Sequence, residues 1–160
     1  MKTLKKCFAT LLLLMIAGTI SSCKKDKQDE KTGESAGSFT YQGSTVKIGT
    51  GDYREGNGDG AWIYLTSEDF TDIVQVRFKG LANYGIPTGS FTYKSNGGIN
   101  PYDPAKNFSG GQVGMDNVYD EFNGGTVKIN KDGGQYLIDL DVTTKNGSLK
   151  GQFKGTLKKI

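Results

Sequence analysis

The sequence predicts an all-β protein, folded as a single antiparallel β-sandwich or β-barrel domain of about 8–9 strands. From Ser38 onward, apolar and polar residues alternate with a period of two, which is typical of strands and not of helices. Turn residues recur about every ten positions. The 160 residues suit one domain with one core, and 24 of them are glycine, which tight turns with positive φ favour.

The first part of the domain contains five predicted strands, which are Ser38–Gln42, Thr45–Gly49, Ala61–Thr66, Asp72–Lys79 and Ser90–Lys94. The first two flank Gly43-Ser44, which predicts a hairpin. Two segments are predicted as loops. Gly51–Gly60 is rich in Gly, Asp and Asn, and Ser95–Gly125 is long and irregular, with a short strand around Gln112–Met115.

The last third alternates most clearly and predicts the strands Thr126–Asn130, Gln135–Thr143 and Ser148–Lys158. Gly151 and Gly155 share the apolar face of the last strand, where glycine indicates close approach of another backbone or a sharp bend. The pentapeptide Gly-Ser-Phe-Thr-Tyr occurs at 37–41 and again at 89–93. We interpret the two copies as equivalent strand starts.

The sequence contains no histidine, which excludes Ser-His-Asp and Cys-His catalysis and the HExxH metal site. Residues 1–22 have the three regions of a signal peptide. Lys2, Lys5 and Lys6 form the basic start, and the apolar run 8–17 is shorter than the roughly 20 residues that a transmembrane helix needs. Small residues then precede Cys23.

The segment Ile20-Ser21-Ser22-Cys23 resembles the lipobox of bacterial lipoproteins. The resemblance implies acylation of the Cys23 sulfur with a fatty acid such as palmitate, cleavage before Cys23, and acylation of the new amino terminus. Cleavage removes three of the 20 basic residues and leaves all 17 acidic ones, so the mature chain is neutral. A neutral chain lacks the basic surface that binds nucleic acid, and we expect no such partner.

Residues 23–37 are predicted to be a lipidated cysteine with a flexible charged tether, and residues 38–160 to be the all-β domain. Positions 24–35 contain no aliphatic or aromatic residue and can bury too little surface to fold. The charges of this segment are similar to the export signal of surface lipoproteins of Bacteroidota, at Lys24, Lys25, Asp26, Asp29 and Glu30. That similarity implies the outer face of the outer membrane, and a solvated linker at the periplasmic face is the alternative.

The C-terminal strand motifs are also similar to those of small β-rich lipoproteins from gut Bacteroidota. The motifs are Ile86–Tyr93, Gly125-Thr126-Val127, Tyr136–Leu140 and Gly151–Leu157. These families mostly lack an assigned activity. The resemblance therefore implies a fold and a location, and it implies no catalytic residue.

Trp62 and Tyr64 alternate with the apolar residues of their predicted strand and so lie on its other face. They belong either to a second layer of core or to an exposed platform on which sugar rings stack. In the platform hypothesis the preceding loop supplies further groups, from Asp52, Tyr53, Asn57 and Asp59. Burial of both Trp62 and Tyr64 would exclude the platform.

Other polar groups match catalytic or metal sites only in part. Glu55 and Thr66 stand where a calcium loop has its first Asp and its last Glu, so we expect no metal and no other cofactor. The carboxylate pairs for glycoside cleavage are Asp120 with Glu121, near Asp116, and Asp139 with Asp141. The second pair is predicted to face solvent, and nothing in the sequence raises a pKa in the first, as an acid catalyst requires.

Together these features predict a lipid-anchored cell-envelope lipoprotein that is not an enzyme and binds glycans or envelope components. Its expected partners are the membrane, through the lipid anchor, and a glycan or an envelope protein. One alternative is a structural or partner-docking lipoprotein without a small ligand. The other is a carboxylate glycoside hydrolase.

Overall fold

A computed structural model of the chain describes residues 36–56, 60–81, 85–95 and 101–160. The predicted signal peptide, Cys23 and positions 24–35 of the tether lie outside these ranges. The described residues form strands and turns, and no α-helix occurs among them. Within this part of the chain, no helix has the length and apolar character needed to cross a membrane.

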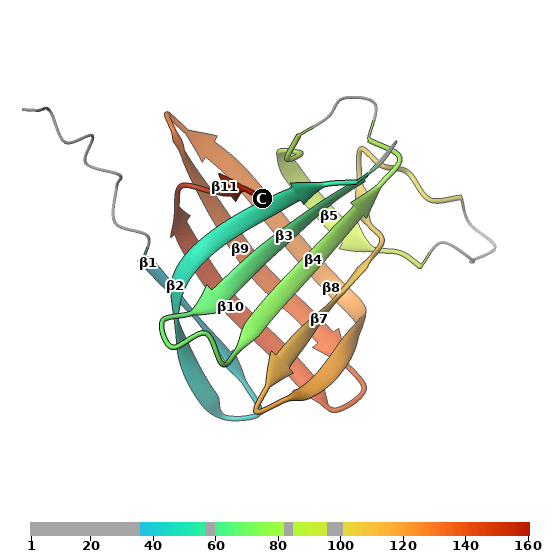
Figure 1. The fold of residues 1–160 in the computed structure, drawn as a ribbon. Helices are drawn as coiled ribbons and strands as arrows, with labels where there is room; N and C mark the ends of the chain where they lie inside the picture. The colour runs from blue at the N-terminus through green and yellow to red at the C-terminus, as the bar shows by residue number, and fades with distance from the viewer. Residues whose placement is uncertain (1–35, 57–59, 82–84, 96–100) are drawn as a thin grey trace, which may run out of the picture. The chain divides into compact units, whose positions relative to one another are not determined.

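Eight strands form a closed antiparallel barrel (Figure 1). Each barrel strand pairs with the barrel strand that follows it in the chain, and the last pairs with the first. The all-β prediction is confirmed, and the closed pairing makes the domain a barrel. The strands are β1 Ala36–Tyr41, β2 Ser44–Glu55, β3 Gly60–Ser67, β4 Ile73–Lys79, β7 Gly110–Met115, β8 Val118–Asp132, β9 Gln135–Thr144 and β10 Gly147–Gly155.

Three further strands extend the sheet. β5 (Gly89–Tyr93) and β6 (Asn107–Phe108) lie between β4 and β7 in the chain, and β11 (Lys158–Lys159) pairs in parallel with β2. β5 pairs antiparallel with the second half of β8, whose first half pairs with β7 (Figure 1). Because β9 occupies the other edge of β8, the ends of β5 and β7 meet beside the middle of β8.

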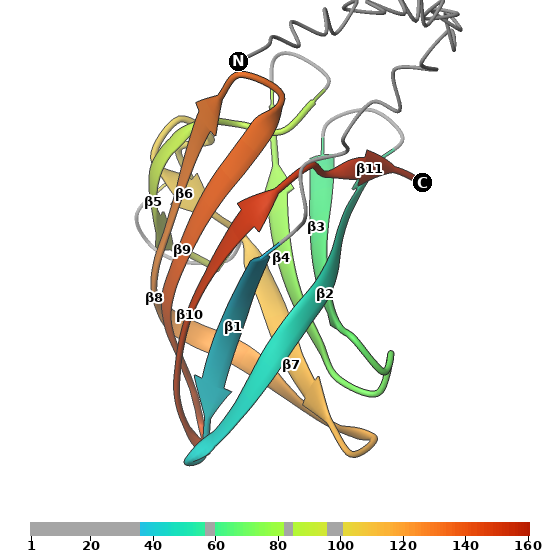
Figure 2. The ribbon, with the colours of Figure 1, turned by 90° about the vertical axis from the view of Figure 1, so that its left-hand side faces the viewer.

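Bends in β2 and β8 allow the sheet to close (Figure 2). The pairing of β2 with β3 shifts register between Ile48 and Thr50, and that of β8 with β9 shifts between Phe122 and Gly124. Such irregularities bend a strand and increase its twist. Gly125 follows the second shift with φ 99°, and a side chain there would collide with the backbone of β9. Glycine is therefore required at this bend.

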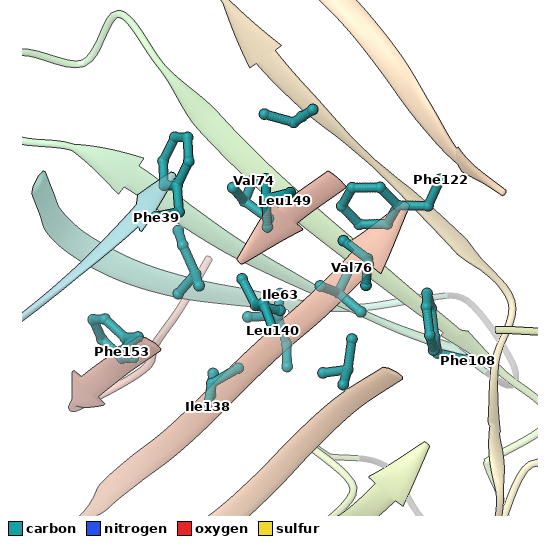
Figure 3. Close-up of a cluster of buried hydrophobic side chains, with 14 of the residues drawn as sticks. Phe39, Ile63, Val74, Val76, Phe108, Phe122, Ile138, Leu140, Leu149 and Phe153 are labelled. Atoms are coloured by element: carbon teal, nitrogen blue, oxygen red, sulfur yellow. The ribbon is translucent and has the colours of Figure 1, made fainter. Parts of the chain in front are cut away.

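Apolar side chains from the barrel strands, β5 and β6 fill the interior (Figure 3). The largest side chains that are fully buried are Phe39, Phe78, Phe91, Phe108 and Phe153. The two copies of the repeated pentapeptide lie in β1 and β5, and the phenylalanine of each copy points inward. A Cβ added to Gly151 would lie 2.8 Å from Cβ of Phe39, which confirms the predicted close approach at this glycine.

The structure corrects three predicted boundaries. β1 begins at Ala36, so residues 36–37 belong to the barrel and not to the tether. Residues 51–55, predicted as loop, continue β2, because Gly51 leaves space that Phe153 and Leu157 fill. Residues 118–125, predicted as irregular, form the first half of β8. The alternation of apolar and polar residues is not visible in this segment, because the polar residue Asp120 occupies an inward position.

Candidate functional site

Trp62 and Tyr64 project from β3 on the outer face of the barrel. Their neighbours Ala61, Ile63 and Leu65 are fully buried on the inner face. Both aromatic side chains are half-buried, and neither is enclosed. The condition that would exclude a stacking platform is therefore not met.

The register of the sheet surrounds Tyr64 with polar groups. Asp52 on β2 and Gln75 on β4 are its direct cross-strand neighbours, and Gln75 pairs in turn with Gln112 on β7. Side chains directly opposite each other have Cβ atoms about 4.5–5.5 Å apart and lie on the same face. The amide nitrogen of Gln75 donates a long hydrogen bond of 3.5 Å to the Tyr64 hydroxyl. Tyr64 therefore leans toward β4.

Trp62 lies one row closer to the barrel end where β3 begins. Its cross-strand neighbours are Arg54 on β2 and Arg77 on β4, so the indole stands in a row between two guanidinium-bearing residues. The indole ring covers Gly56, where any side chain would collide with it. Trp62 is thus held over the end of β2, while Tyr64 points toward the polar side chains of β4.

The remaining predicted ligand-binding residues do not all join this face. Asp52 is on the outer face, but it lies in β2 and not in a loop. Tyr53 alternates to the inner face, where it packs against the core and away from Trp62 and Tyr64. Asn57 and Asp59 lie outside the described residues.

A cavity of about 90 Å³ borders the platform where β4, β5, β7 and β8 meet. Gln75 belongs both to the cavity wall and to the surroundings of Tyr64. The wall contains both polar and aromatic side chains. The lining residues are Gln75, Arg77, Tyr93, Ser109, Gly110, Gly111, Gln112, Glu121 and Phe122.

The predicted carboxylate pair Asp120 and Glu121 does not converge on one cleft. Asp120 is buried, and it accepts hydrogen bonds from the Tyr41 hydroxyl at 2.7 Å and from the side-chain amide of Asn146. The Tyr41 hydroxyl also lies 2.8 Å from that of Thr144. Burial raises the pKa of Tyr41, and the adjacent Asp120 raises it further. Glu121 is exposed on the opposite face of β8.

The other candidate carboxylates are also at the surface. Asp139 and Asp141 share the outer face of β9, as predicted, and Asp141 lies 3.6 Å from the ammonium group of Lys150. In the segment that matches a calcium loop only in part, Glu55 forms an ion pair with Lys159 on β11. Over the described ranges, no three His, Cys, Asp or Glu side chains cluster as metal ligands would.

Three polar residues around Tyr64 and the cavity were not predicted from the sequence, Gln75, Arg77 and Gln112, and Glu121 was named only as part of a carboxylate pair. The alternation of the strand around 72–79 already places Gln75 and Arg77 opposite Val74, Val76 and Phe78. What joins them to Gln112 and Glu121 is the pairing of β4 with β7 and of β7 with β8. That pairing crosses a long insertion and leaves no local signal.

Comparisons with protein-family models, with curated proteins and with solved structures found no match to this chain. The resemblance to lipoproteins of Bacteroidota therefore stays a prediction from the lipobox and the strand motifs.

Proposed function

We propose that this chain is a lipid-anchored lipoprotein of the cell envelope whose barrel binds glycans on the outer face of β2, β3, β4 and β7. The observation that carries this proposal is the position of Tyr64. It is half-buried on an open sheet face, between Asp52 and Gln75, and next to a polar cavity. The proposed activity is binding and not catalysis.

The chemistry of this face matches what sugar rings offer. The apolar C–H face of a pyranose packs on an aromatic ring, while its hydroxyls require directional donors and acceptors. Tyr64 and Trp62 supply two rings on one strand. Asp52, Gln75 and Gln112 supply carboxylate and amide groups in the row that contains Tyr64. Tyrosine holds its shape at little conformational cost, which favours its use in such contacts.

The proposed anchor follows from the lipobox. Acylation at Cys23 would attach the chain to the membrane, and more than one acyl chain gives lasting attachment where a single chain gives marginal binding. Twelve residues, 24–35, separate Cys23 from β1. A flexible segment of this length spans about 20 Å r.m.s., enough to hold the barrel clear of the lipid headgroups. We propose the outer surface of the outer membrane as the location.

Palmitate labelling of growing cells tests the anchor. The wild-type protein should incorporate the label and sediment with membranes, and Cys23→Ala should do neither. Cys7→Ala is the matched control, because Cys7 would leave with the signal peptide. Label that persists in Cys23→Ala would contradict the proposed anchor.

Fluorescence of Trp62, the single tryptophan, tests the glycan site. We expect a subset of a neutral and acidic glycan panel to change the emission of the purified protein. Calorimetry with the same glycans should show weaker binding to Tyr64→Ala and to Trp62→Ala, because each loses a stacking ring. Release of new reducing ends in the same mixtures would support the hydrolase alternative. No binding to any glycan would contradict the proposal.

A second candidate function, docking of a partner protein, is favoured by exposed apolar side chains in two turns. Phe70 is 73% exposed in the β3–β4 turn, and Val118 and Tyr119 are 64% and 58% exposed at the start of β8. The amide of Asp116 donates a hydrogen bond of 3.3 Å to Asp72, so the two turns adjoin. They lie at the barrel end that also carries the β1–β2 turn (Figure 1). If no glycan of the panel binds, docking of a partner protein becomes the favoured function.

A further inference from the structure

Arg77 lines the cavity with unused hydrogen-bonding capacity. Its Nε atom is buried and has no hydrogen-bond partner among the described residues. Within the same residues, no carboxylate lies within 4.0 Å of its guanidinium. A buried donor without an acceptor is rare in folded proteins, and a site that binds an anion is one reason for its presence.

Gly110 keeps this guanidinium in place. Gly110 pairs with Arg77 across β4 and β7, and a Cβ added there would lie 2.9 Å from Nη2. The arginine side chain therefore lies flat over the glycine, at the cavity wall. Ser109 does not satisfy it, because the Ser109 hydroxyl donates at 3.0 Å to the backbone carbonyl of Arg77. The planar fork of an arginine is suited to hold a carboxylate through two parallel hydrogen bonds.

The cavity is small, with a volume of about 90 Å³, and Arg77 forms part of its wall. The carboxylate of an acidic sugar is the group that binds a guanidinium at such a wall. Gln75 lines the cavity and also donates a hydrogen bond to Tyr64, which places the ring that bears the carboxylate on the open face next to these two residues.

Positive and negative side chains occupy different rows of this face. Arg54 and Arg77 flank Trp62 in one row, whereas Asp52 and Glu121 stand at the two ends of the neighbouring row through Tyr64, Gln75 and Gln112. Glu121 also lines the cavity, but it is exposed and pairs with Gln112 and not with Gly110. Water screens its charge, and its oxygens can accept hydrogen bonds from sugar hydroxyls. The anionic group of a ligand therefore belongs at Arg77.

We propose that the site takes an acidic glycan, with the carboxylate of a uronic-acid-type sugar bound by Arg77 in the cavity and the adjoining ring packed at Tyr64. This inference rests on the proposed glycan-binding function and specifies its substrate class. The carboxylate accepts hydrogen bonds from the terminal nitrogens of Arg77. Gln75 and Gln112 contact the ring hydroxyls.

A matched pair of probes tests the charge requirement. A short oligomer of galacturonic acid carries one carboxylate per ring, and its fully methyl-esterified form keeps the rings and loses the charges. We expect the acid to bind the wild-type protein at least tenfold more tightly than the ester, with a preference that declines as salt is added. A sulfated oligosaccharide of similar length serves as a third probe and should bind no more tightly than the ester.

Two variants locate the preference at the cavity. Arg77→Gln should bind the acid and the ester equally, whereas Lys154→Gln, which removes an exposed charge on β10, should keep the wild-type ratio. Gly110→Ala keeps the charge but forces the guanidinium to move, and it should also lose the preference. Thermal unfolding of each variant verifies that it is folded, and Gly110→Ala carries the test if Arg77→Gln is not.

The outcomes separate failure of the acidic-glycan inference from failure of the glycan-binding proposal. Equal binding of acid and ester by the wild-type protein would overturn the acidic-glycan inference and leave the glycan site standing. A preference that survives in both Arg77→Gln and Gly110→Ala would place the carboxylate elsewhere and overturn the inference too. Tightest binding of the sulfated probe would reject a carboxylate as the group recognised. Absence of binding by these probes and by every glycan of the panel would overturn both proposals.

Discussion

Asp120 faces the interior of the barrel and is only 5% exposed, although it carries a carboxylate. Tyr41 and Asn146 make the arrangement stable by donating hydrogen bonds to its two carboxylate oxygens. Buried polar groups are tolerated when they are hydrogen-bonded. Asp120 therefore ties β1, β8 and the β9–β10 turn together.

Removal of this carboxylate should destabilise the barrel. Asp120→Ala leaves the Tyr41 hydroxyl and the Asn146 amide without their acceptor, and we expect the free energy of unfolding to fall by about 1–3 kcal/mol. Urea unfolding measures the change. Glu121→Ala, at the adjacent exposed position, should shift it by less than about 0.5 kcal/mol. Equal effects of the two substitutions would show that the hydrogen bonds of Asp120 do not contribute to stability.

Tyr41 should contribute to a loss of stability in alkaline solution. Burial raises the pKa of this phenol above its usual value of 10.0, so the folded state holds the proton that the unfolded chain releases first. The contribution of Tyr41 is complete below pH 10 and is lost as the pH rises toward its folded pKa. Burial raises the pKa of Tyr102 in the same direction.

Unfolding measured from about pH 8 to about pH 11 checks this dependence. Tyr41→Phe should be less stable than the wild type at neutral pH, because the hydroxyl bonds are lost. It should also lose less stability above pH 10, because the raised pKa of Tyr41 no longer contributes. Parallel curves for the two proteins would contradict a role for the Tyr41 proton.

At the scale of elements, alternation predicted the strands whose inner faces are uniformly apolar. β3, β4 and β9 follow the predicted segments closely, because each buries alternate residues in the core. β10 ends at Gly155, short of the predicted end at Lys158, which belongs to β11. The second half of β2 was missed because Gly51 and Asp52 are typical loop residues. The sequence does not reveal that Phe153 and Leu157, far along the chain, occupy the space over Gly51.

The candidate site was predictable only in part, because it also depends on residues that are far apart in the sequence. The alternation of β3 placed Trp62 and Tyr64 on the outer face, and it did so from residues adjacent in sequence. Their true neighbours are set by strand register. Arg77 meets Gly110 across a segment that contains β5 and β6, and no local pattern connects the two residues. A prediction from sequence could name the aromatic residues but not the cavity beside them.

Gly51 provides a test of how β2 bends into the barrel. A Cβ at this position would lie 2.5 Å from Cζ of Phe153 and 2.6 Å from Cδ2 of Leu157. We expect Gly51→Ala to lower the free energy of unfolding by about 1–3 kcal/mol, as overpacking of a core does. Gly134→Ala is the control, because open space surrounds Gly134 and the effect should stay under about 0.5 kcal/mol. A stable Gly51→Ala protein would contradict this packing.

The interior of the whole barrel is filled with side chains, so we expect ligands to bind at its outer surface. An eight-stranded barrel is just wide enough for side chains to fill it or for one small ligand to occupy it. Here five phenylalanines are fully buried inside, so we expect the barrel to act as a rigid frame for its outer face. A site on paired strands keeps its geometry better than one on loops. In this account the charged tether supplies the location and the face formed by β2, β3, β4 and β7 supplies the recognition.

The most direct test of this account is an NMR map of backbone amide shifts for the labelled protein in detergent, with and without the glycan of the panel that binds most tightly. We expect the largest shifts at Tyr64, Gln75, Arg77 and Gln112, with little change on β9 and β10. Shifts centred on Phe70 and Val118, or spread evenly over the barrel, would contradict a ligand face beside Tyr64.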